Sequence, residues 1–172
     1  MIHVLIADDS AVAREFLAHI IDQQPDMQVV SAVANGAQAV AAVKTLRPHI
    51  VIMDSNMPVL DGFRATRQIM EEAPTPIVIV TASLRPEEVT TTFKAVEAGA
   101  LAVLAKPVGL GHAHFGQVNN TFVQTIRLMS EVKVVRRRNV GPRLRSASDR
   151  QEKTSRQVQG GVVAIGASTG GP

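Results

Sequence analysis

Five short apolar runs recur at intervals of about 25 residues over the first 106 residues, and they constrain the fold more than any other feature. They are HVLIAD (3–8), MQVVSAVA (27–34), HIVIMD (49–54), PIVIV (76–80) and ALAVLAK (100–106). Val and Ile dominate these runs, and most of them lack an alternation of apolar and polar residues. This pattern is typical of strands that are buried on both faces of a parallel sheet.

The segments between and after the runs carry apolar residues at helical spacing. In the first segment, Ser10 is placed to cap a helix whose apolar face holds Val12, Phe16, Leu17, Ile20 and Ile21. The corresponding faces are Ala39, Val40, Val43 and Leu46 in the second segment, and Val118, Phe122, Ile126, Met129 and Val132 in the last. A third helix is expected from about Gly62, burying Ile69, and a fourth from Pro86 to near Gly99. Five strands alternating with five helices predict a doubly wound, five-stranded parallel α/β sheet of flavodoxin-like topology.

The hydrophobic pattern ends at Arg136. Residues 136–160 carry 8 Lys and Arg against 2 Asp and Glu, with few apolar residues and no period. Such a composition predicts a flexible basic linker, and an arm that grips nucleic acid or an anionic membrane is the alternative. We therefore expect a first domain over residues 1–135, a linker over 136–160, and over 161–172 the first strand of a second α/β domain.

Composition excludes several classes of protein. Residues 1–135 are mildly acidic, with 10 Lys and Arg against 13 Asp and Glu, so the first domain shows no basic footprint for nucleic acid. There is no Cys, which excludes disulfides and Cys-based zinc sites and fits a reducing compartment. No secretory leader pattern opens the chain, and no apolar run approaches the roughly 20 residues of a membrane helix. We expect a cytoplasmic protein that neither binds nucleic acid nor inserts into a membrane.

Polar residues gather at the carboxyl ends of the predicted strands, where ligands bind in open α/β sheets. Asp8 and Asp9 end the first strand, and Asp54 ends the third; Thr81 follows the fourth, and Lys106 ends the fifth. Each residue taken alone has an ordinary structural explanation, such as a helix cap or a surface charge. Together they would place three carboxylates in one crevice, where their repulsion is costly unless a cation binds. Mg²⁺ suits such a site because it prefers oxygen ligands.

The motifs that contain these strand-end residues resemble those of a known protein family. The motifs ADDS (7–10), MDSNMPVLDG (53–62), TAS (81–83) and KP (106–107) are similar to those of the receiver domains of two-component response regulators. The resemblance covers residues 2 to about 130. It implies that Asp54 accepts a phosphoryl group from a histidine kinase. It also implies that Asp8, Asp9, Asp54 and the backbone carbonyl of Asn56 hold Mg²⁺, while Lys106 and Thr81 contact the phosphoryl oxygens.

Two further expectations depend on this resemblance. The Lys106–Pro107 bond is often cis in the family, so a cis bond is expected here. Three residues before the lysine, receivers usually carry Tyr or Phe, whereas this chain has Val103. The chain therefore lacks the aromatic side chain on which one form of the family's switch relies.

The last twelve residues indicate what the first domain controls. The segment GVVAIGASTGGP (161–172) matches the G-x-S-x-G pattern, in which a sharp turn after a strand exposes a serine, here Ser168. With the receiver and the linker before it, this segment resembles the start of the catalytic domain of protein-glutamate methylesterases of chemotaxis. The resemblance implies that the receiver controls a methylesterase and glutamine deamidase acting on chemoreceptors, with Ser168 as nucleophile.

A serine nucleophile needs a base and an orienting acid. The five histidines (His3, His19, His49, His112 and His114) all lie in the receiver half, and none is a credible base. We therefore expect residues 1–172 alone to be inactive as an esterase. The alternative is a stand-alone binding module that responds to phosphorylation and has no catalytic output. A DNA-binding regulator is a third alternative, which the sequence favours least.

Overall fold

The computed structural model describes residues 1–82, 89–107 and 115–135. The strands are β1 (Ile2–Ala7), β2 (Met27–Val33), β3 (Ile50–Asp54), β4 (Ile77–Thr81) and β5 (Ala102–Ala105). The helices are α1 (Ala11–Asp22), α2 (Gly36–Leu46), α3 (Gly62–Glu72), α4 (Val89–Ala98) and α5 (Phe115–Ser130). Contacts divide the chain into units over Met1–Arg138 and Asn139–Pro172, and every described residue belongs to the first unit.

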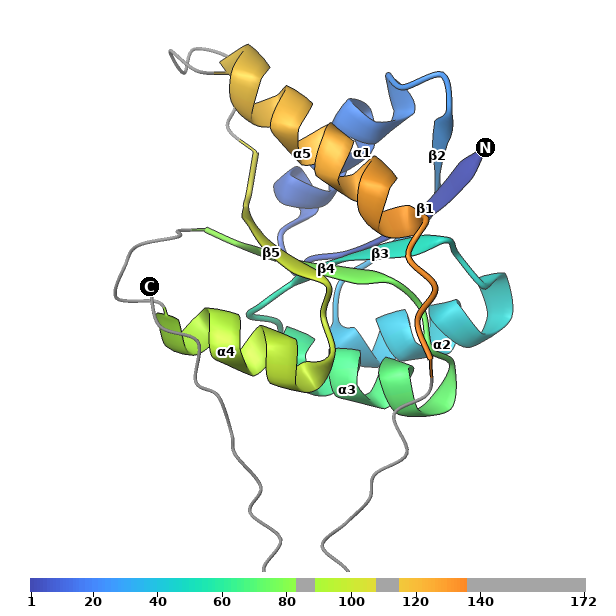
Figure 1. The fold of residues 1–172 in the computed structure, drawn as a ribbon, viewed down its shortest axis with the longest axis vertical. Helices are drawn as coiled ribbons and strands as arrows, with labels where there is room; N and C mark the ends of the chain where they lie inside the picture. The colour runs from blue at the N-terminus through green and yellow to red at the C-terminus, as the bar shows by residue number, and fades with distance from the viewer. Residues whose placement is uncertain (83–88, 108–114, 136–172) are drawn as a thin grey trace, which may run out of the picture. The chain divides into compact units, whose positions relative to one another are not determined.

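The five strands form one parallel sheet in the order β2-β1-β3-β4-β5. Helices α1 and α5 cover one face, and α2, α3 and α4 cover the other (Figure 1). This is the flavodoxin-like order, so the predicted fold is confirmed. The chain leaves β1 toward β2 and later returns to β3 on the other side of β1. The connections after β1 and β3 therefore diverge, which leaves a crevice between the ends of these two strands.

The central strands are buried on both faces. Every residue of β3 and β4 is buried. In β3, Met53 belongs to the core beneath α2, α3 and α4, whereas Ile52 belongs to the core beneath α1 and α5. Because both faces are covered, the strands contain no polar alternation, as the sequence predicted. Truncation of one such side chain, as in Ile52→Ala, would cost about 2–5 kcal/mol.

Capping side chains fix the start of three helices. The Ser10 hydroxyl accepts a hydrogen bond from the backbone N–H of Ala13 at 3.3 Å, which confirms its predicted role. Asn35 and Asp61 cap α2 and α3 in the same way, each with a distance of 2.9 Å. The three caps place the helix starts at the carboxyl edge of the sheet.

The predicted helix faces need three corrections. Val12 is 76% exposed, because it is rotated by roughly 130° from the centre of the buried arc of α1 at about 100° per residue. Leu46 is 44% exposed because it is the last residue of α2. Val132 lies beyond the end of α5. The predicted helix start at Pro86 lies outside the described residues, whereas the predicted end near Gly99 agrees with the last residue of α4, Ala98.

The expected cis bond before Pro107 is wrong, since the described residues contain no cis peptide bond. The trans form is favoured by about 0.5–1 kcal/mol for an ordinary X–Pro bond. None of the described helices is long and apolar enough to cross a bilayer.

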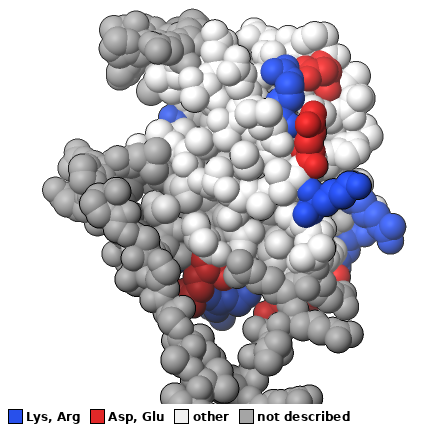
Figure 2. Space-filling view, in the orientation of Figure 1, with Lys and Arg blue, Asp and Glu red and all other residues white. Residues whose placement is uncertain are grey.

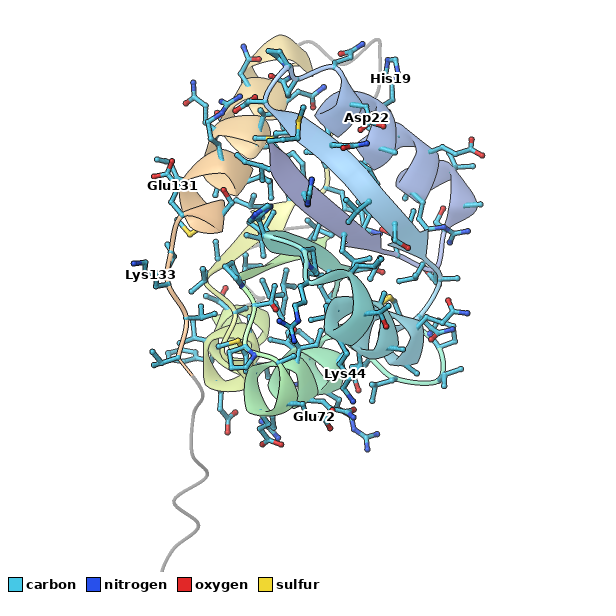
Figure 3. All side chains as sticks on the ribbon, turned by 90° about the vertical axis from the view of Figure 1, so that its right-hand side faces the viewer. His19, Asp22, Lys44, Glu72, Glu131 and Lys133 are labelled. Atoms are coloured by element: carbon cyan, nitrogen blue, oxygen red, sulfur yellow. The ribbon has the colours of Figure 1, made fainter. Side chains whose placement is uncertain are left out.

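Charged side chains of both signs are interspersed on the visible surface. On the face drawn in Figure 2, Lys and Arg lie beside Asp and Glu, without a continuous basic patch. One opposite-charge pair, Lys44 of α2 with Glu72 of α3, links two helices that cover the same face of the sheet (Figure 3).

Candidate functional site

The candidate site lies at the carboxyl edge of the sheet, where four adjacent strands end. Asp8 follows β1, and Asp54 is the last residue of β3. Thr81 is the last residue of β4, and Lys106 follows β5. The structure therefore brings to one edge residues that are far apart in the chain, as the strand pattern predicted.

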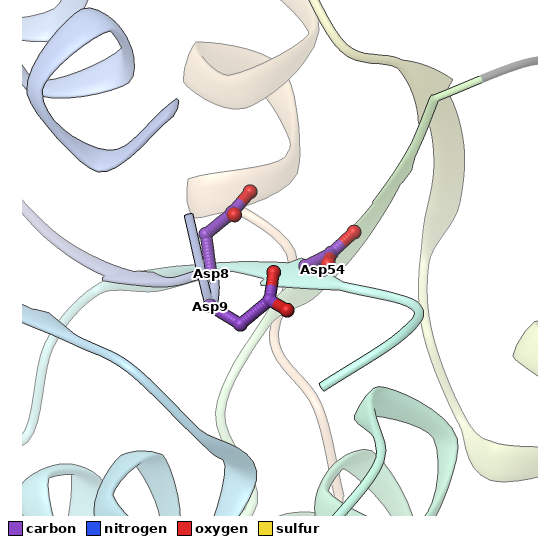
Figure 4. Close-up of side chains that lie close together, drawn as sticks. All are labelled: Asp8, Asp9 and Asp54. Carbon is purple, nitrogen blue, oxygen red and sulfur yellow. The ribbon is translucent and has the colours of Figure 1, made fainter. Parts of the chain in front are cut away.

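Three carboxylates lie close together at the ends of β1 and β3 (Figure 4). One oxygen each of Asp8, Asp9 and Asp54 lies within 4.8 Å of the others. Asp8 is fully buried and Asp54 nearly so, whereas Asp9 is exposed. The set offers only oxygen donors, with one side open to solvent, and such a donor set suits a hard divalent cation.

Lys106 supplies the positive charge of the site. Its Nζ lies 2.7 Å from Oδ2 of Asp8 and 3.2 Å from Oδ1 of Asp54. Its backbone N–H donates to the carbonyl of Thr81 at 2.8 Å, which ties the end of β5 to the end of β4. The ammonium is thus held between the two buried carboxylates.

Burial and neighbouring charges shift the titration of two of these groups. Burial raises the pKa of Asp54 above its ordinary value of 3.8, and the charges of Asp8 and Asp9 add to this, although Lys106 acts in the opposite direction. Burial alone would lower the pKa of Lys106, but the close contact with Asp8 and its charge, together with Asp54, outweigh burial and raise that pKa. Buried groups with perturbed pKa values that share one crevice are typical of functional sites.

Asp8 is only partly satisfied by its surroundings. Its Oδ1 accepts the backbone N–H of Ser10 at 3.0 Å. Its Oδ2 is buried, and within the described residues it has the close ion pair with Lys106 but no contact with hydrogen-bond geometry. A buried carboxylate oxygen without a directional partner leaves a position for a further ligand.

Two positions that sequence reasoning missed shape this edge. A Cβ at Gly62 would lie 1.9 Å from the backbone oxygen of Asp54, so the start of α3 approaches β3 closely only because residue 62 has no side chain. Arg14 of α1 donates from Nη1 to the backbone carbonyls of Asp8 and Asp9. The motif that contains Gly62 was visible in the sequence, but no sequence signal showed that Arg14 turns back toward the acidic pair.

The other residues predicted for the site differ in their exposure. Thr81 is buried, and Asn56 is exposed in the loop after β3. Val103 is partly buried, pairs with Ile79 in the sheet and packs against the core beneath α2, α3 and α4. Ser168, the linker, and the histidines at positions 112 and 114 lie outside the described residues.

The described histidines lie away from the acidic site and have other partners. His49 accepts the backbone N–H of His3 through Nδ1 at 2.8 Å, and the two rings are 5.0 Å apart. Both residues adjoin the opposite end of the sheet, at the start of β1 and β3. His19 contacts Gln23 in the last turn of α1.

Comparison with known proteins gives a consistent result. The family model described as the response regulator receiver domain matches residues 4–114. A protein-glutamate methylesterase/protein-glutamine glutaminase of Nitrosospira multiformis is 47% identical over 174 aligned residues, which cover 100% of this chain and 49% of that protein. The chain thus spans about half the length of the curated relatives it matches.

Solved structures agree with this similarity. The response regulator domain of Thermotoga maritima CheB matches with a TM-score of 0.68 and 38% identity, over 77% of this chain and 98% of that one. A chain in the crystal structure of the P1 domain of CheA3 in complex with CheY6 from R. sphaeroides matches with a TM-score of 0.63 and 26% identity. That match covers 76% of this chain and 98% of the other.

Proposed function

The chain belongs to the response regulator receiver domain family, and from this we propose that Asp54 accepts a phosphoryl group from a histidine kinase. The observation that carries the proposal is the convergence of Asp8, Asp9 and Asp54 within 4.8 Å, with Lys106 in contact with two of them. The solved complex of a kinase P1 domain with a similar chain supports the choice of partner.

The residues at the crevice fit Mg²⁺. Three carboxylate oxygens supply a hard donor set, and within the described part of the chain the buried Oδ2 of Asp8 has the ion pair with Lys106 as its one close partner. We propose that Asp8, Asp9, Asp54 and the backbone carbonyl of Asn56 hold the ion. When bound, it would neutralise the charge of the transferring phosphoryl group.

Asp54 and Lys106 have different roles in the proposed phosphoryl transfer. A carboxylate oxygen of Asp54 attacks phosphorus while the P–N bond of the phosphohistidine breaks, and the departing imidazole nitrogen keeps the electron pair and takes up a proton. Lys106 already lies 3.2 Å from Asp54 and would pair with the phosphoryl oxygens. Asp54 must be ionised to attack, and the positive charge of Lys106 favours that form.

Thr81 is the residue that we expect to respond to the modification. It is buried and ends β4, one residue after Val80, which pairs with Asp54 at the end of β3. We propose that Thr81 moves inward when Asp54 is phosphorylated, so that its hydroxyl donates to a phosphoryl oxygen. This movement would reshape the surface around α4 and α5. Val103 lies where the family usually carries an aromatic ring, so the signal would pass through repacking of an aliphatic side chain.

We further propose that the receiver controls a methylesterase and glutamine deamidase that acts on chemoreceptors in the cytoplasm. Support comes from relatives of that name, whose similarity covers this whole chain, including residues 136–172. This similarity favours an enzyme over a stand-alone binding module. Ser168 would attack the ester carbonyl, methanol would leave, and water would then release the serine.

Residues 1–172 by themselves are proposed to lack esterase activity. A serine nucleophile needs a base within hydrogen-bond reach. The described histidines are engaged elsewhere, His3 with His49 and His19 with Gln23. This part of the protein is thus proposed to carry the regulatory chemistry.

Phosphorylation by a small phosphodonor tests the assignment of Asp54. The 172-residue chain is incubated with acetyl phosphate and MgCl₂, and bound phosphoryl groups are counted by intact-mass spectrometry. Wild type and the control Glu131→Gln should gain one acid-labile group, whereas Asp54→Asn should gain none. Normal incorporation into Asp54→Asn would show that the acceptor lies elsewhere.

The proposed methylesterase activity is tested on a protein extended to the length of its relatives. Methyl release from methylated chemoreceptors is compared for wild type, Asp54→Asn and Ser168→Ala. We expect phosphorylation to increase release from wild type only, and Ser168→Ala to release none. Equal release by Ser168→Ala would remove the serine from the proposal.

A further inference from the structure

Arg14 folds back from α1 onto the loop that carries two of the acidic residues. Its Nη1 donates to the backbone carbonyl of Asp8 at 2.7 Å and to that of Asp9 at 3.1 Å. The side chain therefore joins the early part of α1 to the two residues that precede the helix cap. Hydrogen bonds from a guanidinium are charge-assisted and stronger than those between neutral groups.

The two acidic residues differ in how their carboxylates are held. Asp8 has its own supports, since Ser10 donates to its Oδ1 and Lys106 lies beside its Oδ2. Asp9 is exposed, and among the described residues the one side chain that bonds to it is Arg14, through the backbone carbonyl. The direction of the Asp9 carboxylate therefore depends mainly on the backbone that Arg14 holds.

We propose that Arg14 is a positioning residue, which fixes the backbone of Asp8 and Asp9 so that both carboxylates face Mg²⁺. This inference rests on the proposed function, because it takes the acidic cluster as the Mg²⁺ site. Arg14 touches neither the ion nor the phosphoryl group; it acts through the loop. Residues that orient metal ligands in this way typically account for a 10- to 100-fold change in metal affinity.

The sign of the effect separates positioning from simple charge. Arg14 is a positive charge near three carboxylates, so its removal should strengthen the attraction of the site for a cation if charge alone matters. If Arg14 positions the loop, its removal weakens Mg²⁺ binding. The two explanations predict opposite changes in the same dissociation constant.

Calorimetric titration of the 172-residue chain with MgCl₂ measures that constant directly. The variants are Arg14→Gln, which loses the charge and most of the donors, and Arg14→Lys, which keeps the charge on a more flexible amine. Arg64→Gln is the matched control, because Arg64 is an exposed arginine of α3, a helix that begins at the same edge of the sheet. Thermal unfolding in EDTA reports whether each variant folds.

We expect the dissociation constant to rise by about 10-fold in Arg14→Gln, by less in Arg14→Lys, and not at all in Arg64→Gln. An unchanged or lower dissociation constant in Arg14→Gln, with normal unfolding in EDTA, overturns the inference and leaves the proposed function intact. If Arg14→Gln does not fold, Arg14→Lys decides alone, and wild-type affinity in that variant overturns the inference. Absence of Mg²⁺ binding to wild type overturns the proposed function itself.

Discussion

Gly62 lies directly against the backbone of Asp54, and a methyl group on its α-carbon would stand 1.9 Å from the Asp54 carbonyl oxygen. The N–H of Gly62 also donates to the carbonyl of Ser55 at 3.2 Å. The start of α3 is thereby packed onto the end of β3, where the proposed phosphoacceptor sits. The position of Asp54 thus depends on a residue that carries no chemistry.

Gly62→Ala should therefore destabilise the fold and disturb the site together. The backbone of α3 must move, and overpacking of this kind costs about 1–3 kcal/mol. Urea unfolding gives the change in stability, and MgCl₂ titration gives the change in the site. Ala41→Ser, on the exposed side of α2, is the control. Wild-type stability of Gly62→Ala would show that α3 accommodates the methyl group.

Removal of Lys106 should leave two buried carboxylates without their counter-charge. Lys106→Met is expected to lower the free energy of unfolding by about 3–5 kcal/mol at pH 7 in EDTA. Lys94→Met, at an exposed position of α4, should change it little. Chemical unfolding of both variants tests this. Equal losses in the two variants would mean that the ion pairs add nothing to stability.

The Asp54 carboxylate should oppose folding at neutral pH when no cation is bound. Burial raises its pKa above 3.8, so the folded chain holds this proton more tightly than the unfolded chain. Ionisation of Asp54 therefore lowers the free energy of unfolding as the pH rises through the pKa of the folded chain. Below pH 3.8 the group is protonated in both states, so this destabilisation is absent. In EDTA, Asp54→Asn should melt at a higher temperature than wild type at pH 7, and at a similar temperature near pH 3. A lower melting temperature at pH 7 contradicts this.

A second carboxylate has the opposite pH dependence. Arg127 of α5 makes two hydrogen bonds to Asp26, at 2.6 and 2.8 Å, and they lower the pKa of Asp26 below 3.8. The contribution of ionised Asp26 to stability is fully present above pH 3.8. It is lost as the pH falls through the lower pKa that Asp26 has in the folded chain. Asp26→Asn should reduce the melting temperature at pH 7, and the difference should shrink at acid pH.

The pair also provides its own control. In an Arg127→Met background, Asp26→Asn should have no such effect, because the partner is already absent. An equally large effect in both backgrounds would assign it to something other than the ion pair.

Mg²⁺ should stabilise the folded chain, since the unfolded chain has no assembled site. At a concentration 100 times the dissociation constant the gain is about 2.7 kcal/mol, and EDTA should reverse it. Asp9→Asn should reduce the gain while leaving stability in EDTA nearly unchanged, because Asp9 is exposed. The same gain in Asp9→Asn and wild type would exclude Asp9 as a ligand.

The fold was predictable because its central strands are buried on both faces. In β3 and β4 the environment demands apolar side chains on both faces, so the pattern survives in the sequence. Helix faces were predicted less well, since a spacing of three or four residues from one apolar residue also admits positions outside the buried arc. Val12 is such a position: it lies four residues before Phe16 but roughly 130° from the centre of the buried arc, and it is exposed.

The acidic site was predictable in its location, because the carboxyl ends of parallel strands share one edge. Asp8, Asp54 and Lys106 could be placed there from the ends of the apolar runs alone. The contacts that hold these residues in place could not be predicted from the sequence. The contact of Gly62 with Asp54 and the return of Arg14 to the loop after β1 depend on helix orientations that local spacing does not encode.

The strand order has a consequence for protein synthesis. The residues of the site come from β1, β3, β4 and β5, which are neighbours in space but are separated along the chain by crossover helices. A nascent chain that has left the ribosome only as far as β4 holds the acidic residues without the lysine that balances them. Such an intermediate carries unpaired carboxylates at its open edge. The proposed phosphoacceptor site would therefore be complete only after a late step, when β5 docks beside β4 and brings Lys106 next to Asp8 and Asp54.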